Sequence, residues 1–212
     1  EEWPVTDNPI AEATARIFAD LADPQTLNAA RDDGWRAPSR LAGRSHTPSR
    51  SSANPSDAMA AKRRHFVIGV DLGGTKISSA AVSDDGETVI GLRSVATQPE
   101  LGADGVVDRI IGVIEGVIRD TINETGATRK DFIGIGVGAP GPLDREKGLV
   151  VVAPNLGWRD FPLRDRIGGP LGLPVTLDND ANCATVGEWW LGAARGGRNV
   201  VGITIGTGIG GG

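Results

Sequence analysis

The chain has 212 residues and a formal net charge of -5, with 39% hydrophobic but only 4% aromatic residues. This composition is typical of a globular protein and lacks the basic and aromatic surplus of a nucleic-acid platform. The single cysteine, Cys183, excludes an internal disulfide and a multi-cysteine zinc site within the chain. No run approaches the roughly 20 apolar residues of a membrane span, and no secretory signal pattern opens the chain, so we expect a cytoplasmic protein.

Residues 1–64 differ in charge and composition from the rest of the chain and are interpreted as an extension. Residues 1–35 hold eight acidic and two basic side chains, whereas residues 36–64 hold seven basic and one acidic. We expect one or two short helices within about residues 9–30, followed by a disordered basic linker rich in Ser, Pro and Arg. The only methionine, Met59, precedes the first strong strand pattern. The sequence before it is therefore either foreign, mis-joined sequence or a tolerated natural extension.

Short apolar runs separated by turns begin at Phe66. Residues 66–70, 77–82 and 88–96 predict three strands, joined first by a tight glycine turn and then by an acidic turn. No helix pattern follows the first glycines, which argues against a P-loop. We therefore expect these strands to form an antiparallel meander.

Helices and strands alternate through the middle of the chain. The apolar residues of 104–125 recur at helical spacing, and Gly126 is a stop signal. A meander followed by alternating helices and strands predicts an α/β domain with a mixed sheet flanked by helices. The other expected elements are strands at 132–137, 149–152 and 175–177, a rigid loop at 138–143, a short helix at 161–169 and a helix at 181–194 that buries Val186, Trp189, Trp190 and Leu191.

The end of the chain repeats the first strand and its glycine turn. Residues 200–208 align with residues 67–75 at an offset of 133, although chance similarity of two glycine-rich strands is an alternative. Two equivalent hairpins would each aim backbone N–H groups at a phosphate chain. The spacing of the last glycines also fits a dinucleotide fingerprint, but they follow about six strands instead of opening the fold, which argues against an oxidoreductase. The candidate phosphate-binding residues are Asp71, Gly73, Gly74, Thr75, Lys76, Gly206, Thr207, Gly208, Gly210 and Gly211.

Asp71 ends the first strand and is the candidate magnesium ligand. A carboxylate at this place suits a Mg²⁺ ion shared with nucleotide phosphates, bound directly or through water. A turn-capping carboxylate is the alternative. Lys76 follows the turn, and strand alternation leaves open whether it points toward the phosphates.

The segment 178–180 joins a strand to a helix and contains the candidate catalytic carboxylate. Asp180 falls at the N-cap or in the first turn, where helix N–H groups stabilise negative charge. A capping role alone is possible, but the amides of Asn155 and Asn179 suit a polyhydroxylated ligand. A carboxylate near them can take a proton from a sugar hydroxyl as that oxygen attacks a terminal phosphate.

Four motifs occur in order and are followed by GTGIGGG at the end of the chain. They are DLGGTK at 71–76, GAPGP at 138–142, PNLGW at 154–158 and DNDAN at 178–182. Over about residues 66–212 the sequence resembles the ROK family, which contains the bacterial glucokinase-like sugar kinases of the actin and hexokinase superfamily. The resemblance implies an actin-like, ribonuclease H-like lobe over residues 65–199 and the first strand and phosphate loop of a second lobe at 200–212, where the chain stops.

The resemblance also implies roles for individual residues. Asp180 would be the catalytic base, Asn155, Asn179 and Gly141 would hold a hexose, and the two glycine hairpins would hold ATP with Mg²⁺. Glu188 would support the sugar site, although a helix-surface salt bridge is an equal alternative. The family's zinc motif follows GTGIGGG, so a structural zinc ion is expected only beyond this chain.

The function that the resemblance implies is phosphorylation of a hexose hydroxyl by ATP, with glucose as the expected sugar. We expect the complete protein to perform it, to be a homo-oligomer and to have no membrane partner, and this chain to be a nearly inactive fragment. A sugar-responsive ROK repressor is the alternative, in which the site senses sugar and an N-terminal winged helix binds nucleic acid. Residues 1–58 show no such module.

Overall fold

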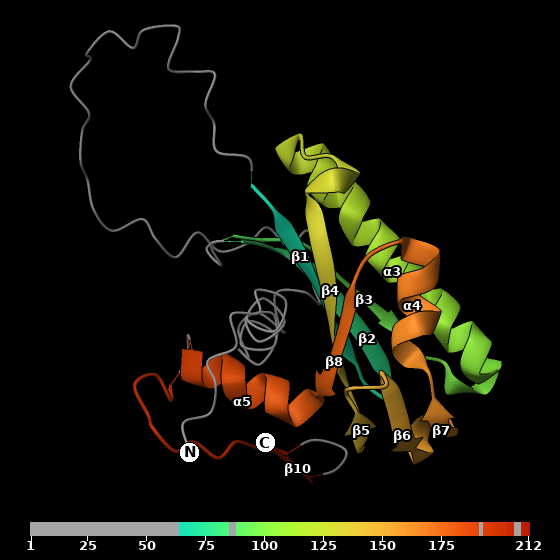
Figure 1. Cartoon of the computed structure of the whole chain (residues 1–212), viewed down its shortest axis with the longest axis vertical. Helices are drawn as coiled ribbons and strands as arrows, with labels where there is room; N and C mark the ends of the chain where they lie inside the picture. The colour runs from blue at the N-terminus through green and yellow to red at the C-terminus, as the bar shows by residue number, and fades with distance from the viewer. Residues whose placement is uncertain (1–63, 85–87, 191–192, 206–208) are drawn as a thin grey trace, which may run out of the picture.

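A computed structural model of the chain describes residues 64–84, 88–190, 193–205 and 209–212 (Figure 1). The predicted helices and linker before residue 64 lie outside the described residues. A five-stranded sheet with strand order β3-β2-β1-β4-β8 stands at the centre. Its strands are β1 (Phe66–Leu72), β2 (Lys76–Ser83), β3 (Val89–Ala96), β4 (Phe132–Ala139) and β8 (Val175–Asn179).

The central sheet is mixed, as predicted. Strand β2 is antiparallel to both β1 and β3, whereas β1, β4 and β8 run parallel to one another. The three parallel strands end at the same edge, and Asp71, Gly138 and Asp178 lie in register across them. This edge therefore collects the ends of three strands that carry candidate site residues.

Helices cover both faces of the sheet (Figure 1). The α3 helix (Gly102–Thr125) and the α4 helix (Leu163–Leu171) lie on one face, and the α5 helix (Asp180–Trp190) lies on the other. Along β1, alternate residues from Phe66 to Leu72 belong to the main core with α3, whereas Val67 belongs to a second cluster. Strand alternation consequently places Asp71 on the face that carries α5.

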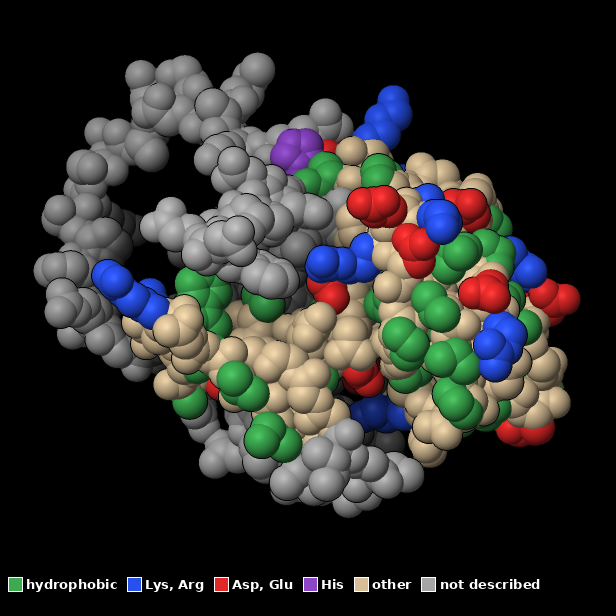
Figure 2. Space-filling model, turned by 60° about the horizontal axis from the view of Figure 1, so that its bottom comes forward, with side chains coloured by type: hydrophobic (Ala, Val, Ile, Leu, Met, Phe, Trp, Pro, Cys, Tyr) green, Lys and Arg blue, Asp and Glu red, His purple; other side chains and the backbone are tan. Residues whose placement is uncertain are grey.

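The predicted helix at 104–125 is confirmed as α3, which buries one apolar side against the sheet. It ends at Gly126, whose left-handed backbone (φ 73°) directs its N–H to the carbonyl oxygen of Ile122 at 2.9 Å. No helix among the described residues is both long and apolar enough to cross a membrane. On the face shown in Figure 2, the visible acidic and basic side chains are interspersed.

A small three-stranded sheet, order β5-β6-β7, adjoins the central sheet and was only partly predicted. Its strands are β5 (Leu143–Asp144), β6 (Leu149–Ala153) and β7 (Trp158–Phe161). The loop expected at 138–143 runs into β5, and the helix expected from Phe161 begins two residues later, because Phe161 pairs with β6 and stacks on Trp158 at 4.3 Å. Helix α4 continues through Pro170 and ends at Gly172 (φ 64°). Short 3-10 helices span Pro99–Leu101, Arg129–Asp131 and Pro154–Leu156.

The prediction that α5 buries its large apolar side chains is wrong for two of them. Val186 is 40% exposed and Trp189 38% exposed. The buried positions of α5 include Ala181 and Cys183, so this helix approaches the sheet with small side chains and directs larger ones outward. The side chain of Trp190, and Leu191 as a whole, lie outside the described residues, and residues 193–196 form a turn instead of extending the helix.

The repeated segment at the end of the chain forms a second hairpin, shorter than predicted. Strand β9 (Ile203–Ile205) pairs antiparallel with β10 (Ile209–Gly211), so the strand expected from Val200 begins only at Ile203. The two hairpins differ in register by one residue. Leu72 pairs with Ile77 across four intervening residues, whereas the equivalent Ile205 pairs with Ile209 across three.

Candidate functional site

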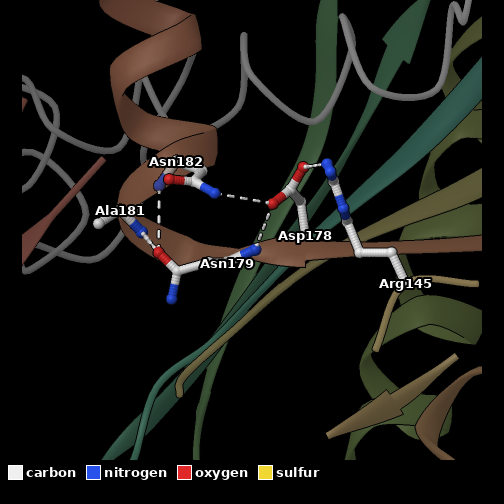
Figure 3. A network of polar contacts seen from close by, with 5 residues as sticks. All are labelled: Arg145, Asp178, Asn179, Ala181 and Asn182. Carbon is white, nitrogen blue, oxygen red and sulfur yellow. Dashed lines mark hydrogen bonds and ion pairs between the residues drawn. The ribbon is translucent and has the colours of Figure 1, made fainter. Parts of the chain in front are cut away.

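The N-terminus of α5 is built by the DNDAN motif (Figure 3). Asn179 caps the helix, because its Oδ1 accepts hydrogen bonds from the backbone N–H groups of Ala181 (3.0 Å) and Asn182 (3.2 Å). Asp180 is the first helical residue, and its Oδ1 accepts a hydrogen bond from Ala181 N at 2.8 Å. The capping position thus belongs to Asn179, which leaves Asp180 in the first turn beside the edge of the sheet.

Asp178 fixes the start of this helix to neighbouring elements. Its Oδ1 accepts hydrogen bonds from Asn179 N (2.7 Å) and Asn182 Nδ2 (3.1 Å). Its Oδ2 pairs with the guanidinium of Arg145 at 2.9 Å, and Arg145 lies in the turn between β5 and β6 (Figure 3). Asp178 is therefore a structural carboxylate, and neither it nor Arg145 was assigned a role from the sequence.

Asp71 lies partly buried near Asp180. Burial is the main reason that the pKa of Asp71 is raised from 3.8 to about 6, and the negative charge of Asp180 raises it further. The positive charge of Lys76 acts in the opposite direction. The structure thus brings together the predicted metal ligand, the predicted base and the exposed Lys76, whose direction the sequence left open.

Cys183 lies near the same negatively charged side chains. It is a small buried side chain on α5. Burial, followed by the charges of Asp178, Asp180 and Asp71, raises the pKa of its thiol. Three carboxylates therefore lie within electrostatic reach of one side chain at the beginning of α5.

The predicted sugar residues come from three loops that approach this edge. A Cβ atom on Gly74 would lie 3.2 Å from the Cβ of Asn155, so the first glycine turn contacts the PNLGW loop. Gly141 has φ 87°, and a Cβ there would lie 2.1 Å from the carbonyl oxygen of Val152, so only glycine fits. The carbonyl oxygen of Gly141 accepts a long hydrogen bond (3.4 Å) from Asn179 Nδ2.

A buried threonine that sequence reasoning missed holds the first glycine turn. Thr97 directly follows β3, and its Oγ1 donates a hydrogen bond to the carbonyl oxygen of Gly73 at 2.7 Å. Its backbone N–H donates to the carbonyl oxygen of Thr75 at 2.9 Å. Because this role depends on a contact between residues 24 apart in the sequence, no local pattern could have indicated it.

The second hairpin packs on the first turn of α5. A Cβ on Gly210 would lie 3.5 Å from the Cβ of Ala181, and one on Gly212 would lie 2.4 Å from its carbonyl oxygen. Gly211 pairs with Ile203 in the hairpin. The start of α5 thus lies between the two hairpins. The predicted phosphate contacts Gly206, Thr207 and Gly208 lie outside the described residues.

Glu188 is not brought to Asp180. It lies eight residues further along α5, and its Oε2 accepts a hydrogen bond from the backbone N–H of Ala193 at 2.9 Å. This bond holds the turn that follows the helix. A role of Glu188 in sugar binding therefore stays a prediction without a contact to support it.

The mixed sheet and its flanking helices define an α/β lobe of the actin-like fold. Residues 67–212 match the ROK family. The chain belongs to the ROK family.

Individual relatives match the same region. A glucokinase of Halalkalibacterium halodurans is 39% identical over 147 residues, which are 69% of this chain and 43% of that protein. A ROK family glucokinase structure from Streptomyces griseus, in complex with glucose and AMPPNP, is 40% identical with a TM-score of 0.60, over 69% of this chain and 43% of that one. A putative xylose repressor of Caldicellulosiruptor sp. is 33% identical over 69% of this chain and 36% of its own length. The chain thus spans less than half the length of these relatives.

Proposed function

We propose that these residues belong to an ATP-dependent sugar kinase that phosphorylates a hexose hydroxyl, with glucose as the first substrate to test. The observation that carries this proposal is the convergence of Asp71, Asp180 and two glycine hairpins at the start of α5. The similarity to glucokinases supports it. Because the chain spans 43% of those relatives, the proposal concerns the complete protein that carries this lobe.

In this proposal Asp180 is the general base. It would accept the proton of the attacking sugar hydroxyl, while Asn155 and the amide nitrogen of Asn179 hold neighbouring hydroxyls. The Oδ1 of Asn179 is already used by the helix N-terminus, so its Nδ2, whose present bond to Gly141 is long, is the group available to a sugar. Backbone N–H groups of the glycine hairpins would face the phosphates of ATP.

Asp71 is suited to hold a Mg²⁺ ion that accompanies ATP. Its partly buried carboxylate near a second carboxylate is the donor chemistry that this ion prefers. Burial and the charge of Asp180, which raise the pKa of Asp71, both favour the approach of a cation. The described residues contain no group of three or more His, Cys, Asp or Glu side chains that could hold a metal ion by themselves. This fits an ion that takes its other ligands from phosphate and water. When bound, Mg²⁺ supplies compensation of phosphate charge.

Substitution of the base tests the proposal. In the complete protein, Asp180→Asn should lower kcat for glucose phosphorylation by about 10²–10⁴-fold, because the amide cannot accept the proton. ADP release with and without glucose measures this loss. The matched control is Asp165→Asn, which changes an exposed carboxylate on α4 and should leave kcat unchanged. Glucose-dependent turnover that survives Asp180→Asn would contradict the proposed base.

The similarity to a putative xylose repressor supports a second candidate function. In a repressor the same site would bind sugar without transferring phosphate, and the bound sugar would release DNA. A complete protein that binds hexose, shows no ATP consumption and forms a sugar-released DNA complex would establish this alternative.

A further inference from the structure

The loop between β1 and β2 is a three-residue glycine turn whose backbone is held from one side. Gly73 N–H donates to the carbonyl oxygen of Lys76 at 2.9 Å, which closes the turn. The carbonyl oxygens of Gly73 and Thr75, on either side of Gly74, both point to Thr97. Thr97 thus anchors the peptide groups at both ends of the turn.

The direction of these two carbonyls determines the direction of an N–H group. The carbonyl of Gly73 and the N–H of Gly74 belong to the same planar trans peptide, in which C=O and N–H point in opposite directions. The 2.7 Å bond from Thr97 Oγ1 to the Gly73 oxygen therefore turns the Gly74 N–H away from Thr97. Gly74 is also the residue that contacts Asn155 of the predicted sugar loop.

Thr97 is itself held rigidly. The carbonyl oxygen of the preceding Ala96 accepts a hydrogen bond from Arg109 Nε of α3 at 2.6 Å. The following Gln98 has φ 52°, a left-handed conformation that non-glycine residues adopt only at a cost. Arg109 and the sharp bend at Gln98 thus fix Thr97 between β3 and α3.

We propose that Thr97 is a positioning residue for nucleotide binding: its hydroxyl orients the Gly74 peptide so that its N–H faces the phosphates of a nucleoside triphosphate. This rests on the proposed function of the first glycine turn. The side chain is fully buried, and a buried hydroxyl is costly unless it is hydrogen-bonded. Valine would fill the same space without that cost, so the threonine is explained by its bond to the turn.

The test compares Thr97→Val with a matched control in the complete protein. Thr121→Val removes another fully buried hydroxyl, which donates to the carbonyl oxygen of Val117 at 2.8 Å within α3. Both variants should remain folded, which urea unfolding checks, and Thr121→Val should cost less stability because the Val117 carbonyl keeps its helical hydrogen bond. Only Thr97→Val should raise the Kd of Mg-ATP, by about tenfold, measured by calorimetry.

Two further measurements separate positioning from a general loss of structure. Thr97→Ser keeps the donor and should restore the Kd of Mg-ATP to within about twofold of the wild type. In steady-state kinetics, Thr97→Val should raise the KM for ATP while kcat and the KM for glucose change by less than about twofold. Equal Kd values for the Thr97→Val and Thr121→Val variants would overturn the inference.

Failure of the proposed function gives a different result. If the wild type binds Mg-ATP but transfers no phosphate to a hexose, the kinase proposal fails and the Kd comparison still judges Thr97. If the wild type does not bind Mg-ATP, the first glycine turn is not a phosphate site, and both proposals fall.

Discussion

The two glycine hairpins have similar sequences but different surroundings. In the first, β1 and β2 are embedded in a five-stranded sheet, and Val70 is fully buried. In the second, among the described residues of this chain, which spans less than half the length of its relatives, β9 and β10 pair only with each other, and Ile203, at the position equivalent to Val70, is 68% exposed. The first hairpin is held by the sheet and by Thr97, whereas the second packs against α5 through its glycines.

Within this chain the repeated sequence therefore repeats a local turn but not its surroundings. Asp71 at the end of β1 corresponds to Thr204 in β9, so of the two hairpins only the first carries a partly buried carboxylate. Removing a charge from water costs several kcal/mol unless it is paired. The first hairpin thus carries the charged group, and the second contacts α5 through its glycines.

We expect the largest difference between the two hairpins in the pH dependence of stability, which Asp71 causes in the first hairpin. Its pKa is raised from 3.8 to about 6 on folding, so its contribution to stability is complete below pH 3.8 and is lost as pH rises through 6. This raised pKa corresponds to a loss of about 3 kcal/mol in the free energy of unfolding above pH 6. Asp71→Asn should be about 3 kcal/mol more stable than the wild type at pH 8 and about equal to it at pH 3.5, measured by urea unfolding without divalent cations.

Two controls accompany this measurement. Thr204→Val, at the equivalent position of the second hairpin, should leave the pH dependence unchanged. Asp180→Asn should reduce it only in part, because burial is the larger cause of the shifted pKa. A wild type and an Asp71→Asn variant with parallel stability profiles between pH 4 and 8 would show that Asp71 is solvated and the comparison mistaken.

The second prediction compares equivalent apolar positions. Val70→Ala should lower the free energy of unfolding by about 2 kcal/mol, because it leaves a cavity in the core beneath α3. Ile203→Ala should change it by less than about 0.5 kcal/mol, because its side chain is mostly in solvent. Urea unfolding followed by circular dichroism measures both.

A third substitution tests whether the small effect expected at Ile203 is shared by a neighbouring exposed residue. Val201 precedes the second hairpin and is 82% exposed, so Val201→Ala should match Ile203→Ala. Costs near 2 kcal/mol for both would mean that these residues are packed in solution, and the contrast between the hairpins would then disappear.

The elements that could be predicted from the sequence are those with a strong local pattern. The apolar run that begins at Phe66 and the helical spacing of 104–125 gave β1 and α3 nearly to the residue, because burial on one or both faces imposes that pattern. Strand β5 has two residues, Leu143 and Asp144, and exists only through pairing with β6. The exposure of Trp189 likewise depends on which side of α5 meets the sheet.

The residues of the candidate site also differ in whether a local sequence pattern predicts them. Asp71 and Asp180 stand out in the sequence because a carboxylate at the end of a strand or the start of a helix has a recognisable chemistry. Thr97 does not, since its role arises from a bond to Gly73, 24 residues away in sequence. The contact between Gly74 and Asn155 is also a product of tertiary structure.

The smallest effect concerns the pair Arg145–Asp178, which links the supports of the two hairpins. Arg145 follows β5 in the small sheet, and Asn155, which contacts Gly74, lies in the 3-10 helix between β6 and β7 of that sheet. Asp178 precedes α5, on which the second hairpin packs. Both side chains are partly exposed, so the pair should contribute less than about 1 kcal/mol. Arg145→Met should therefore raise the KM for glucose by no more than about threefold and leave the KM for ATP unchanged.

A double-mutant cycle with Asp178→Asn isolates this contribution. Asp178 keeps its bonds from Asn179 and Asn182 when Arg145 is replaced, so the coupling energy reports only the bridge between the small sheet and α5. The coupling should shrink at 0.5 M salt, because the Debye length then falls to about 4 Å. A coupling well above 1 kcal/mol that resists salt would mean that the bridge is shielded from solvent, and that the two hairpins are joined more firmly than their separate surroundings indicate.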